Sequence, residues 1–173
     1  MNTIPVSDTW ESGSPYEQYI GRWSRRVAPI FLSWLDLAPQ MRWLDVGCGT
    51  GALSAAIFNL CSPKCVTGVD PSEGFLKLAS QSLAGKATLH IGTATAIPLA
   101  ASSVDVVVSG LVLNFVPNVP EALTEMCRVT KPAGVLAAYV WDYKDQMELI
   151  RICLLYTSPS PRDRTRSRMP SSA

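Results

Sequence analysis

The sequence predicts an α/β fold, a doubly wound and mostly parallel sheet behind an N-terminal helical leader. Two observations predict it. Short, almost wholly apolar runs alternate with segments of helical periodicity. The apolar runs also lack the polar alternation of a sheet with one solvated face. A length of 173 residues suits one domain, so the pattern indicates a single sheet with right-handed crossovers and helices on both faces.

The leader is predicted to be helical from Ser14, which is a suitable N-cap because Glu17 lies three residues later. We expect an interruption near Pro29, since an interior proline removes a helical hydrogen bond. The helix then resumes over 30–37 with apolar side chains at helical spacing, and Pro39 closes the segment.

The strands and helices that follow are predicted from run length, flanking turn residues and periodicity. Pro132 and Gly134 indicate a turn before the last strand, and a further helix is expected from about Asp145. The predicted strands span residues 42–46, 65–69, 87–91, 104–110 and 135–140, and the predicted helices span residues 50–60, 72–83 and 120–129.

Composition excludes several classes of protein. A formal net charge of +1 offers no strongly basic surface, so no nucleic-acid partner is expected. No apolar stretch approaches the roughly 18–20 residues of a membrane span, and the first residues lack a secretory signal pattern. Five irregularly spaced cysteines do not suggest a disulfide framework. We therefore expect a reduced, cytoplasmic protein without a membrane partner.

The composition changes abruptly at Cys153. Residues 153–163 resemble the translation of a transposase sequencing adaptor, and residues 167–173 resemble the flow-cell adaptor that follows it, in the same frame. We therefore interpret 153–173 as an artefactual, disordered tail on a C-terminally truncated chain. Leaving out its four arginines and one aspartate, from 15 basic and 14 acidic residues, changes the net charge from +1 to −2.

A glycine-rich turn is the strongest functional signal. The sequence Gly47-Cys48-Gly49-Thr50-Gly51 ends an apolar strand and opens a helix, where a doubly wound sheet binds cofactors. Glycines there let the backbone approach a ligand, and the helix N-terminus offers free N–H groups. Asp70 closes the next strand, 23 residues after Gly47, where a carboxylate can accept both hydroxyls of a ribose.

Two cofactors remain open on this motif. With Ala52, the turn also satisfies the G-x-G-x-x-A pattern of dinucleotide sites. However, Asp45 places a negative charge where it would oppose a pyrophosphate, whereas it would suit an ammonium group. The pattern therefore favours S-adenosylmethionine, which has no phosphate and carries an ammonium and a sulfonium.

Four segments together resemble class I S-adenosylmethionine-dependent methyltransferases of the small-molecule group labelled methyltransferase type 11. They are WLDVGCGTG (43–51), VTGVDPSEGFLKLA (66–79), SVDVVVSGLVLNFVPN (103–118) and MCRVTKPAGVLAAYVWD (126–142). The resemblance implies a Rossmann-like sheet in the order 3-2-1-4-5-7-6, of which this chain would supply strands 1–5. It implies a small-molecule acceptor. Methyl transfer from a sulfonium requires no metal, so none is expected.

The resemblance also implies the roles of individual residues. Asp45 would hold the amino group of the cofactor, Asp70 the ribose, and Thr93 the adenine amino group. Thr93 stands where the family usually has an aspartate, so this contact would be made by a neutral hydroxyl. The full set of predicted cofactor-binding residues is Asp45, Gly47, Cys48, Gly49, Gly51, Asp70, Pro71, Thr93, Ala94, Ser109, Gly110 and Leu111.

No catalytic residue is assigned. His90 is interpreted as structural rather than as a general base, and Asn114 and Phe115 as loop packing rather than substrate contacts. The pair Cys61 and Cys65 has no nearby histidine, so no zinc site is predicted. The helix face carrying Tyr16, Tyr19, Arg22 and Trp23 could close over the cofactor or pack on the domain, and Asp142 and Tyr143 could contact substrate or cap a helix.

The domain organisation follows from these assignments: a leader over 1–40, an incomplete methyltransferase domain over 41–152 and the tail over 153–173. Two alternatives to methyl transfer remain, a non-catalytic S-adenosylmethionine-binding module and an NAD(P)-binding oxidoreductase. Because strand 5 would be an unpaired apolar edge, we expect this truncated chain to be poorly soluble and inactive.

Overall fold

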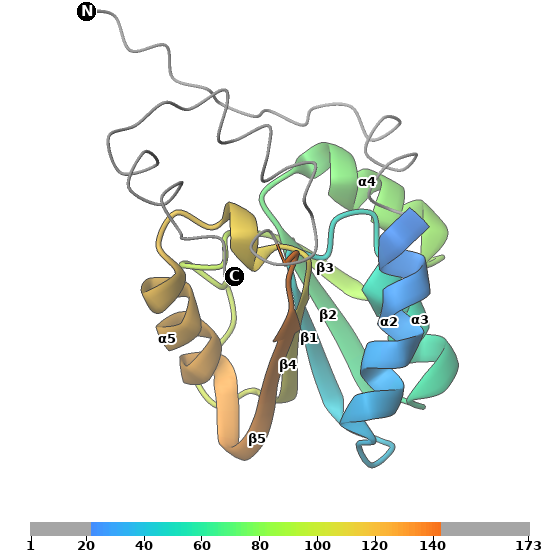
Figure 1. The fold of residues 1–173 in the computed structure, drawn as a ribbon, viewed down its shortest axis with the longest axis horizontal. Helices are drawn as coiled ribbons and strands as arrows, with labels where there is room; N and C mark the ends of the chain where they lie inside the picture. Colours follow the sequence, from blue (N-terminus) through green and yellow to red (C-terminus); the bar gives the residue numbers. More distant parts are fainter. Residues whose placement is uncertain (1–21, 143–173) are drawn as a thin grey trace, which may run out of the picture. The chain divides into compact units, whose positions relative to one another are not determined.

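The structure, a computed structural model, describes residues 22–142, and residues 22–140 belong to one compact unit. The predictions at Ser14, Asp145 and the tail from Cys153 lie outside the described residues. In chain order the elements are α2 (Arg22–Leu35), β1 (Arg42–Val46), α3 (Ala52–Leu60), β2 (Cys65–Asp70), α4 (Glu73–Ser82), β3 (Thr88–Ile91), β4 (Val104–Gly110), the 3-10 helix η2 (Leu113–Phe115), α5 (Val119–Val129) and β5 (Thr130–Tyr139) (Figure 1).

The five strands form one parallel sheet in the order β3-β2-β1-β4-β5. The central strand, β1, is buried along almost its whole length, and Leu44 pairs with Thr67 on one side and Val107 on the other. Apolar runs without polar alternation are typical of strands covered on both faces. The predicted fold class and strand order are therefore confirmed.

Helices cover both faces of the sheet, and Figure 1 shows α2 and α3 on one side and α5 on the other. Trp43 and Leu44 point to opposite faces, as the alternation along a strand requires. Trp43 packs into a cluster with residues of α2 and α3, including Phe31 and Ile57. Leu44 packs into a second cluster with Met126 and other residues. Each face thus has its own apolar core.

Local sequence signals set the helix starts. Ser72 caps α4, since its Oγ accepts a hydrogen bond from the N–H of Phe75 at 3.3 Å. Asn118 caps α5 through a bond from the N–H of Glu121, also at 3.3 Å, and Pro120 lies in the first turn, where a missing N–H costs nothing.

Pro29 does not interrupt the first described helix, contrary to the prediction. The helix α2 runs continuously through it from Arg22 to Leu35. Ala28, Phe31 and Leu32 are all buried in the same cluster with the sheet. Packing on both sides of the proline therefore outweighs the loss of one helical hydrogen bond.

The turn predicted at Pro132 and Gly134 lies inside a strand rather than before it. Thr130 already pairs with Val104, and the register then shifts so that Val135 pairs with Val106. The extra residues form a bulge in which Ala133 adopts a left-handed φ of 61°. The strand therefore begins at Thr130, five residues before the predicted start.

Between β3 and β4 the chain makes a loop that α5 holds in place. The N–H of Ile97 donates to Glu125 Oε1 at 2.9 Å, and Arg128 Nη2 donates to the carbonyl of Ile97 at 3.1 Å. Arg128 and Glu125 also form a bidentate pair with two bonds of 2.7 Å.

Within residues 22–142, no helix has both the length and the apolar character to cross a bilayer.

The two faces of α5 predict different responses to truncation. Met126 is fully buried, whereas Leu123 is 38% exposed. We expect Met126→Ala to lower the free energy of unfolding by about 2–5 kcal/mol, because it leaves a cavity in the core. Leu123→Ala, on the same helix, should cost about 1 kcal/mol or less. Urea unfolding monitored by circular dichroism measures both; equal losses would contradict the assignment of faces.

Candidate functional site

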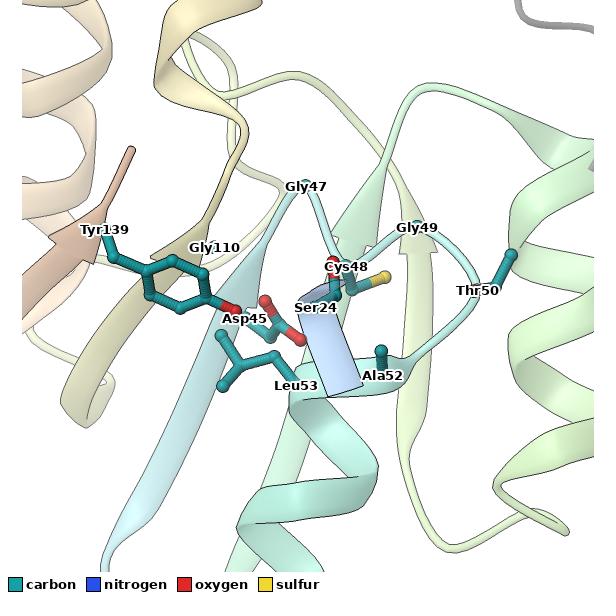
Figure 2. Close-up of a pocket in the computed structure, with 10 residues that line it drawn as sticks. All are labelled: Ser24, Asp45, Gly47, Cys48, Gly49, Thr50, Ala52, Leu53, Gly110 and Tyr139. Atoms are coloured by element: carbon teal, nitrogen blue, oxygen red, sulfur yellow. The ribbon is translucent and has the colours of Figure 1, made fainter. Parts of the chain in front are cut away.

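The candidate site lies where the order of the strands reverses. From β1 the sheet continues through β2 to β3 in one direction and through β4 to β5 in the other. A crevice forms at the carboxyl ends of the strands at such a switch point. The pocket found there takes residues from α2, β1, the glycine turn, α3, β4 and β5 (Figure 2); they are Ser24, Asp45, Gly47, Cys48, Gly49, Thr50, Ala52, Leu53, Gly110 and Tyr139.

The glycine turn needs glycine for its backbone conformation. Gly47, Gly49 and Gly51 have φ values of 73°, 53° and 88°, all in the left-handed region that disfavours other side chains. Space is also limiting, because a Cβ at Gly47 would lie 2.5 Å from the Cγ atoms of Val112. The turn therefore lies close to the side chain of Val112, which follows β4.

Hydrogen bonds from β2 fix the turn in place. The N–H groups of Gly47 and Cys48 donate to the carbonyl of Val69 at 2.7 and 3.1 Å. Asp70 accepts from the N–H of Gly49 through Oδ2 and from the N–H of Ser72 through Oδ1, both at 2.9 Å. This carboxylate therefore joins the glycine turn to the start of α4.

Asp45 is the charged group of the pocket. It is 1% exposed, and its Oδ2 accepts a hydrogen bond of 2.7 Å from the hydroxyl of Ser54, in the first turn of α3. Burial raises the pKa of Asp45 to about 7, and the negative charge of Asp70 adds to the rise, while hydrogen bonds from Ser54 oppose it. Near neutral pH this carboxyl group is thus poised between its two charge states.

Cys48 contacts the sheet rather than acting as an exposed thiol. A Cβ placed on Gly68 of β2 would lie 2.8 Å from Cys48 Sγ, so the thiol fills the space above that glycine. Burial raises the pKa of Cys48 far above its usual range, and the charges of Asp45 and Asp70 add to the shift. A thiol held protonated is a poor nucleophile, which favours a packing role.

The end of β4 meets the pocket through Gly110. Next to it, the hydroxyl of Ser109 donates to the carbonyl of Val46 at 2.9 Å and so ties β4 to β1. Leu111 has a φ of 62°, and its N–H donates to the carbonyl of Tyr139 at 2.8 Å. A left-handed leucine is uncommon and marks a constrained bend directly beside the site.

Of the predicted site residues, the structure brings Asp45, Gly47, Cys48, Gly49 and Gly110 together around one pocket. The remaining ones do not line this pocket: Gly51, Asp70, Pro71, Thr93, Ala94, Ser109 and Leu111. Pro71 and Thr93 are exposed, at the ends of β2 and β3. Their position at the carboxyl edge of the sheet keeps them on the side where the pocket lies.

The sequence reasoning missed Ser24 and Tyr139. Ser24 lies on α2, two residues after Arg22, on the helix that was considered as a cover for the cofactor. Tyr139 ends β5, and the rule that sites form at carboxyl ends of strands could have identified it. Tyr16, Tyr19 and Tyr143 lie outside the described residues, and Trp23 is 42% exposed.

The other candidates lie away from the pocket. His90 is half-buried in β3, while Asn114 and Phe115 form part of η2, where Phe115 is 53% exposed. Within the described range, no three His, Cys, Asp or Glu side chains gather as a metal-binding group. None of these residues contributes to the pocket lining.

The chemistry of the pocket suits a positively charged ligand. Among the described lining residues the ionisable acid is the buried Asp45, and none carries a positive charge. A diphosphate would be repelled by this carboxylate without a compensating cation, whereas an ammonium or sulfonium would stabilise its charged form. The residues present therefore fit S-adenosylmethionine better than a dinucleotide.

Sequence comparison identifies a family. Residues 44–138 match the model of the family described as Methyltransferase domain. This match covers more than half of the chain and spans the sheet from β1 to β5. It confirms the predicted family and, with it, S-adenosylmethionine as the cofactor.

Individual relatives agree on the class of enzyme but differ in substrate. The chain is 31% identical over 140 residues to demethylmenaquinone methyltransferase of Symbiobacterium thermophilum, covering 78% of this chain and 50% of that protein. It is 34% identical over 101 residues to malonyl-[acyl-carrier protein] O-methyltransferase of Methylococcus capsulatus, covering 57% and 37%. The chain thus spans half or less of the length of these relatives.

A solved structure shows the same fold. Phosphoethanolamine N-methyltransferase 1 of Haemonchus contortus, in complex with phosphoethanolamine and S-adenosylhomocysteine, superposes with a TM-score of 0.61. The identity is 22%, and the alignment covers 70% of this chain and 26% of that one. At this identity the likeness is one of fold.

The buried carboxyl of Asp45 predicts an unusual dependence of stability on pH. Its folded pKa, about 7, lies above the ordinary value of 3.8, so the folded state holds the proton more tightly. The stability gained from this tighter proton binding is fully present below about pH 4 and is lost as the pH rises through 7. We expect Asp45→Asn, which keeps an acceptor for Ser54, to remove this loss and to be at least as stable as the wild type at pH 8.

Asp105 provides the matched control with the opposite sign. Lys131 donates to its Oδ1 at 2.6 Å and the N–H of Arg42 to its Oδ2 at 2.8 Å, and these bonds lower its pKa. The stability that the charged Asp105 carboxylate contributes is present above its pKa in the unfolded chain. It is lost as the pH falls through its lower pKa in the folded state. Asp105→Asn should therefore destabilise at pH 8. Urea titrations at pH 5 and 8 measure the free energy of unfolding of each variant relative to the wild type. If this difference changed with pH in the same direction for both variants, the assignments would be contradicted.

Proposed function

Because this chain belongs to the Methyltransferase domain family, we propose that it binds S-adenosylmethionine at the switch-point pocket and transfers the methyl group to a small-molecule acceptor. The observation that carries the proposal is a buried carboxylate, Asp45, beside a turn of left-handed glycines and without a cation in the described lining. That combination accepts a positively charged nucleoside and disfavours a pyrophosphate.

In the proposed complex, Asp45 holds the amino group of the cofactor. When the Asp45 carboxyl is protonated before binding, it loses its proton as the ammonium binds, because a neighbouring ammonium lowers the pKa of a carboxyl group. Ser54 keeps Asp45 oriented by its 2.7 Å bond. The free energy lost in burying the carboxylate is thus partly regained when a cation binds.

Asp70 takes a double role in this proposal. Both of its oxygens already accept backbone N–H groups, from Gly49 and Ser72, at 2.9 Å. A carboxylate oxygen has a second lone pair, so each can still accept a ribose hydroxyl. The same residue would then set the turn and bind the ribose, while Pro71, Thr93 and Ala94 would lie on the adenine side.

The bound cofactor supplies a methyl group on a sulfonium, a leaving group that needs no further activation, for in-line displacement by the acceptor. The task of this chain is therefore to hold donor and acceptor in line. Gly47 and Gly110 let both backbones approach the ligand, and the buried hydroxyl of Ser109 keeps β4 and β1 together at the site. No catalytic base is assigned among the described residues.

The acceptor differs among the relatives. The two relatives carry different acceptors in their names, demethylmenaquinone and malonyl-[acyl-carrier protein]. A shared donor site with divergent acceptors is consistent with function residing in sites on a common fold.

We also propose a cytoplasmic location, which is supported by four cysteines that are free thiols within the described chain.

Binding measurements test the donor site directly. We expect isothermal titration to show binding of S-adenosylhomocysteine and none of NADH, because the Asp45 carboxylate repels the diphosphate. Gly47→Ala should weaken binding by more than about tenfold, since its Cβ would meet Val112 at 2.5 Å and displace the turn.

The control is Gly85→Ala. Gly85 has a φ of 72°, nearly equal to that of Gly47, but no atom lies within 4 Å of an added Cβ. The control therefore imposes the same backbone strain without a steric clash. It should leave binding unchanged. Transfer of labelled methyl groups to a cell extract would exclude the non-catalytic module, although the truncated chain itself is expected to be inactive. Binding of NADH alone would indicate the oxidoreductase.

A further inference from the structure

Ile97 lies in the loop between β3 and β4, and side chains of α5 bind both of its backbone polar groups. Its N–H donates to Glu125 Oε1 at 2.9 Å, and its carbonyl oxygen accepts from Arg128 Nη2 at 3.1 Å. In a sheet these two groups would pair with a neighbouring strand. The helix therefore holds the loop as a strand partner would, at one defined residue.

Glu125 and Arg128, which we call the clamp, form one closed unit. Arg128 donates to both carboxylate oxygens of Glu125 at 2.7 Å, from Nε and from the same Nη2 that reaches Ile97. A guanidinium paired in this way with a carboxylate fixes the orientation of both groups. The two side chains are 38% and 18% exposed. Because exposed ion pairs add little stability, the main effect of the clamp is to fix the position of Ile97.

A short, tight turn connects the clamp to the end of β3. The N–H of Ala96 donates to the carbonyl of Thr93 at 3.1 Å, and these two residues form an isolated bridge. A Cβ at Gly92 would lie 2.8 Å from Pro98 Cδ and 3.2 Å from the carbonyl oxygen of Ala96, so the segment folds back on its own start. Ile97 itself is 3% exposed in the core. A shift of Ile97 is therefore transmitted to Thr93.

Thr93 lies beside the proposed ribose site. Asp70 pairs with Ile91 across β2 and β3, and the N–H of Gly92 donates to the carbonyl of Asp70 at 3.2 Å. Thr93 is the next residue, at the carboxyl edge of the sheet. A nucleoside whose ribose binds Asp70 in the proposed manner has its base on the side of residues 93–96.

We propose that Glu125 and Arg128 are positioning residues for the adenine of the bound cofactor. They act through Ile97 and the turn over 93–96, not through contact with the ligand. This inference rests on the proposed function and deepens it, because it assigns control of the adenine contacts to a helix that contributes nothing to the described pocket lining.

Two probes separate adenine positioning from general stability. S-adenosylhomocysteine carries the adenine, whereas S-ribosylhomocysteine keeps the ribose and the homocysteine and lacks the base. Arg128→Met removes the guanidinium but keeps the backbone carbonyl of residue 128, which accepts from the N–H of Ser102 at 2.9 Å. We expect this variant to bind S-adenosylhomocysteine about fivefold or more weakly in isothermal titration, and to keep its affinity for S-ribosylhomocysteine, measured by competition, within about twofold.

Glu125→Ala should give the same selective loss. The double variant should lose no more affinity than either single variant, since the two side chains act as one unit.

Asn118→Ala is the matched control on the same helix. It removes a contact of the same i, i+3 spacing, from Asn118 Nδ2 to Glu121 Oε2 at 2.9 Å, together with the N-cap of α5. It therefore destabilises α5 and leaves the clamp in place, so both affinities should be unchanged.

Each result of the titrations decides the proposal. Equal weakening of both probes by Arg128→Met, no weakening of either, or the same loss in Asn118→Ala overturns it while the proposed function stands. Failure of the wild-type chain to bind S-adenosylhomocysteine overturns the proposed function and this inference with it.

Discussion

The reversal of strand order beside β1 is the constraint on which the site depends. The chain builds β1, β2 and β3 outward in one direction and then returns to place β4 on the other side of β1. The segments that leave β1 and β4 therefore diverge, and no crossover covers the gap between their carboxyl ends. Gly47 and Gly110, which follow or end these strands, line that gap because of topology rather than proximity in sequence.

Burial of Asp45 ties stability to ligand chemistry. A carboxylate that is 1% exposed and accepts a hydrogen bond from Ser54 is costly in the charged form. A protein that needed only stability would place an apolar side chain at the end of its central strand. Retaining an acid there is intelligible when a cation occupies the pocket, since local conflicts with folding rules concentrate at functional sites.

The sequence identified contiguous features and missed those made by distant segments. The strands followed from apolar runs, and Asp45 with the glycine turn followed from one motif. Ser24 and Tyr139 come from α2 and β5 and meet through tertiary packing, which no local pattern encodes. Pro29 was misjudged for the same reason, because the burial of its neighbours Ala28 and Phe31 is a property of the packed domain. These residues also give α2 a shared core with the sheet.

The irregular start of β5 explains how Tyr139 reaches the pocket at all. Successive side chains of a strand face opposite sides, so a slip of one residue would turn Tyr139 away from Gly110, its register partner. The register is set after the bulge, where Ala133 takes a left-handed φ, and the bulge is held by the 2.6 Å ion pair of Lys131 with Asp105. Gly134 fits there because a Cβ would lie 2.7 Å from the carbonyl oxygen of Asp105. A bulge near the amino end of the strand thus determines which side chain faces the pocket at its carboxyl end.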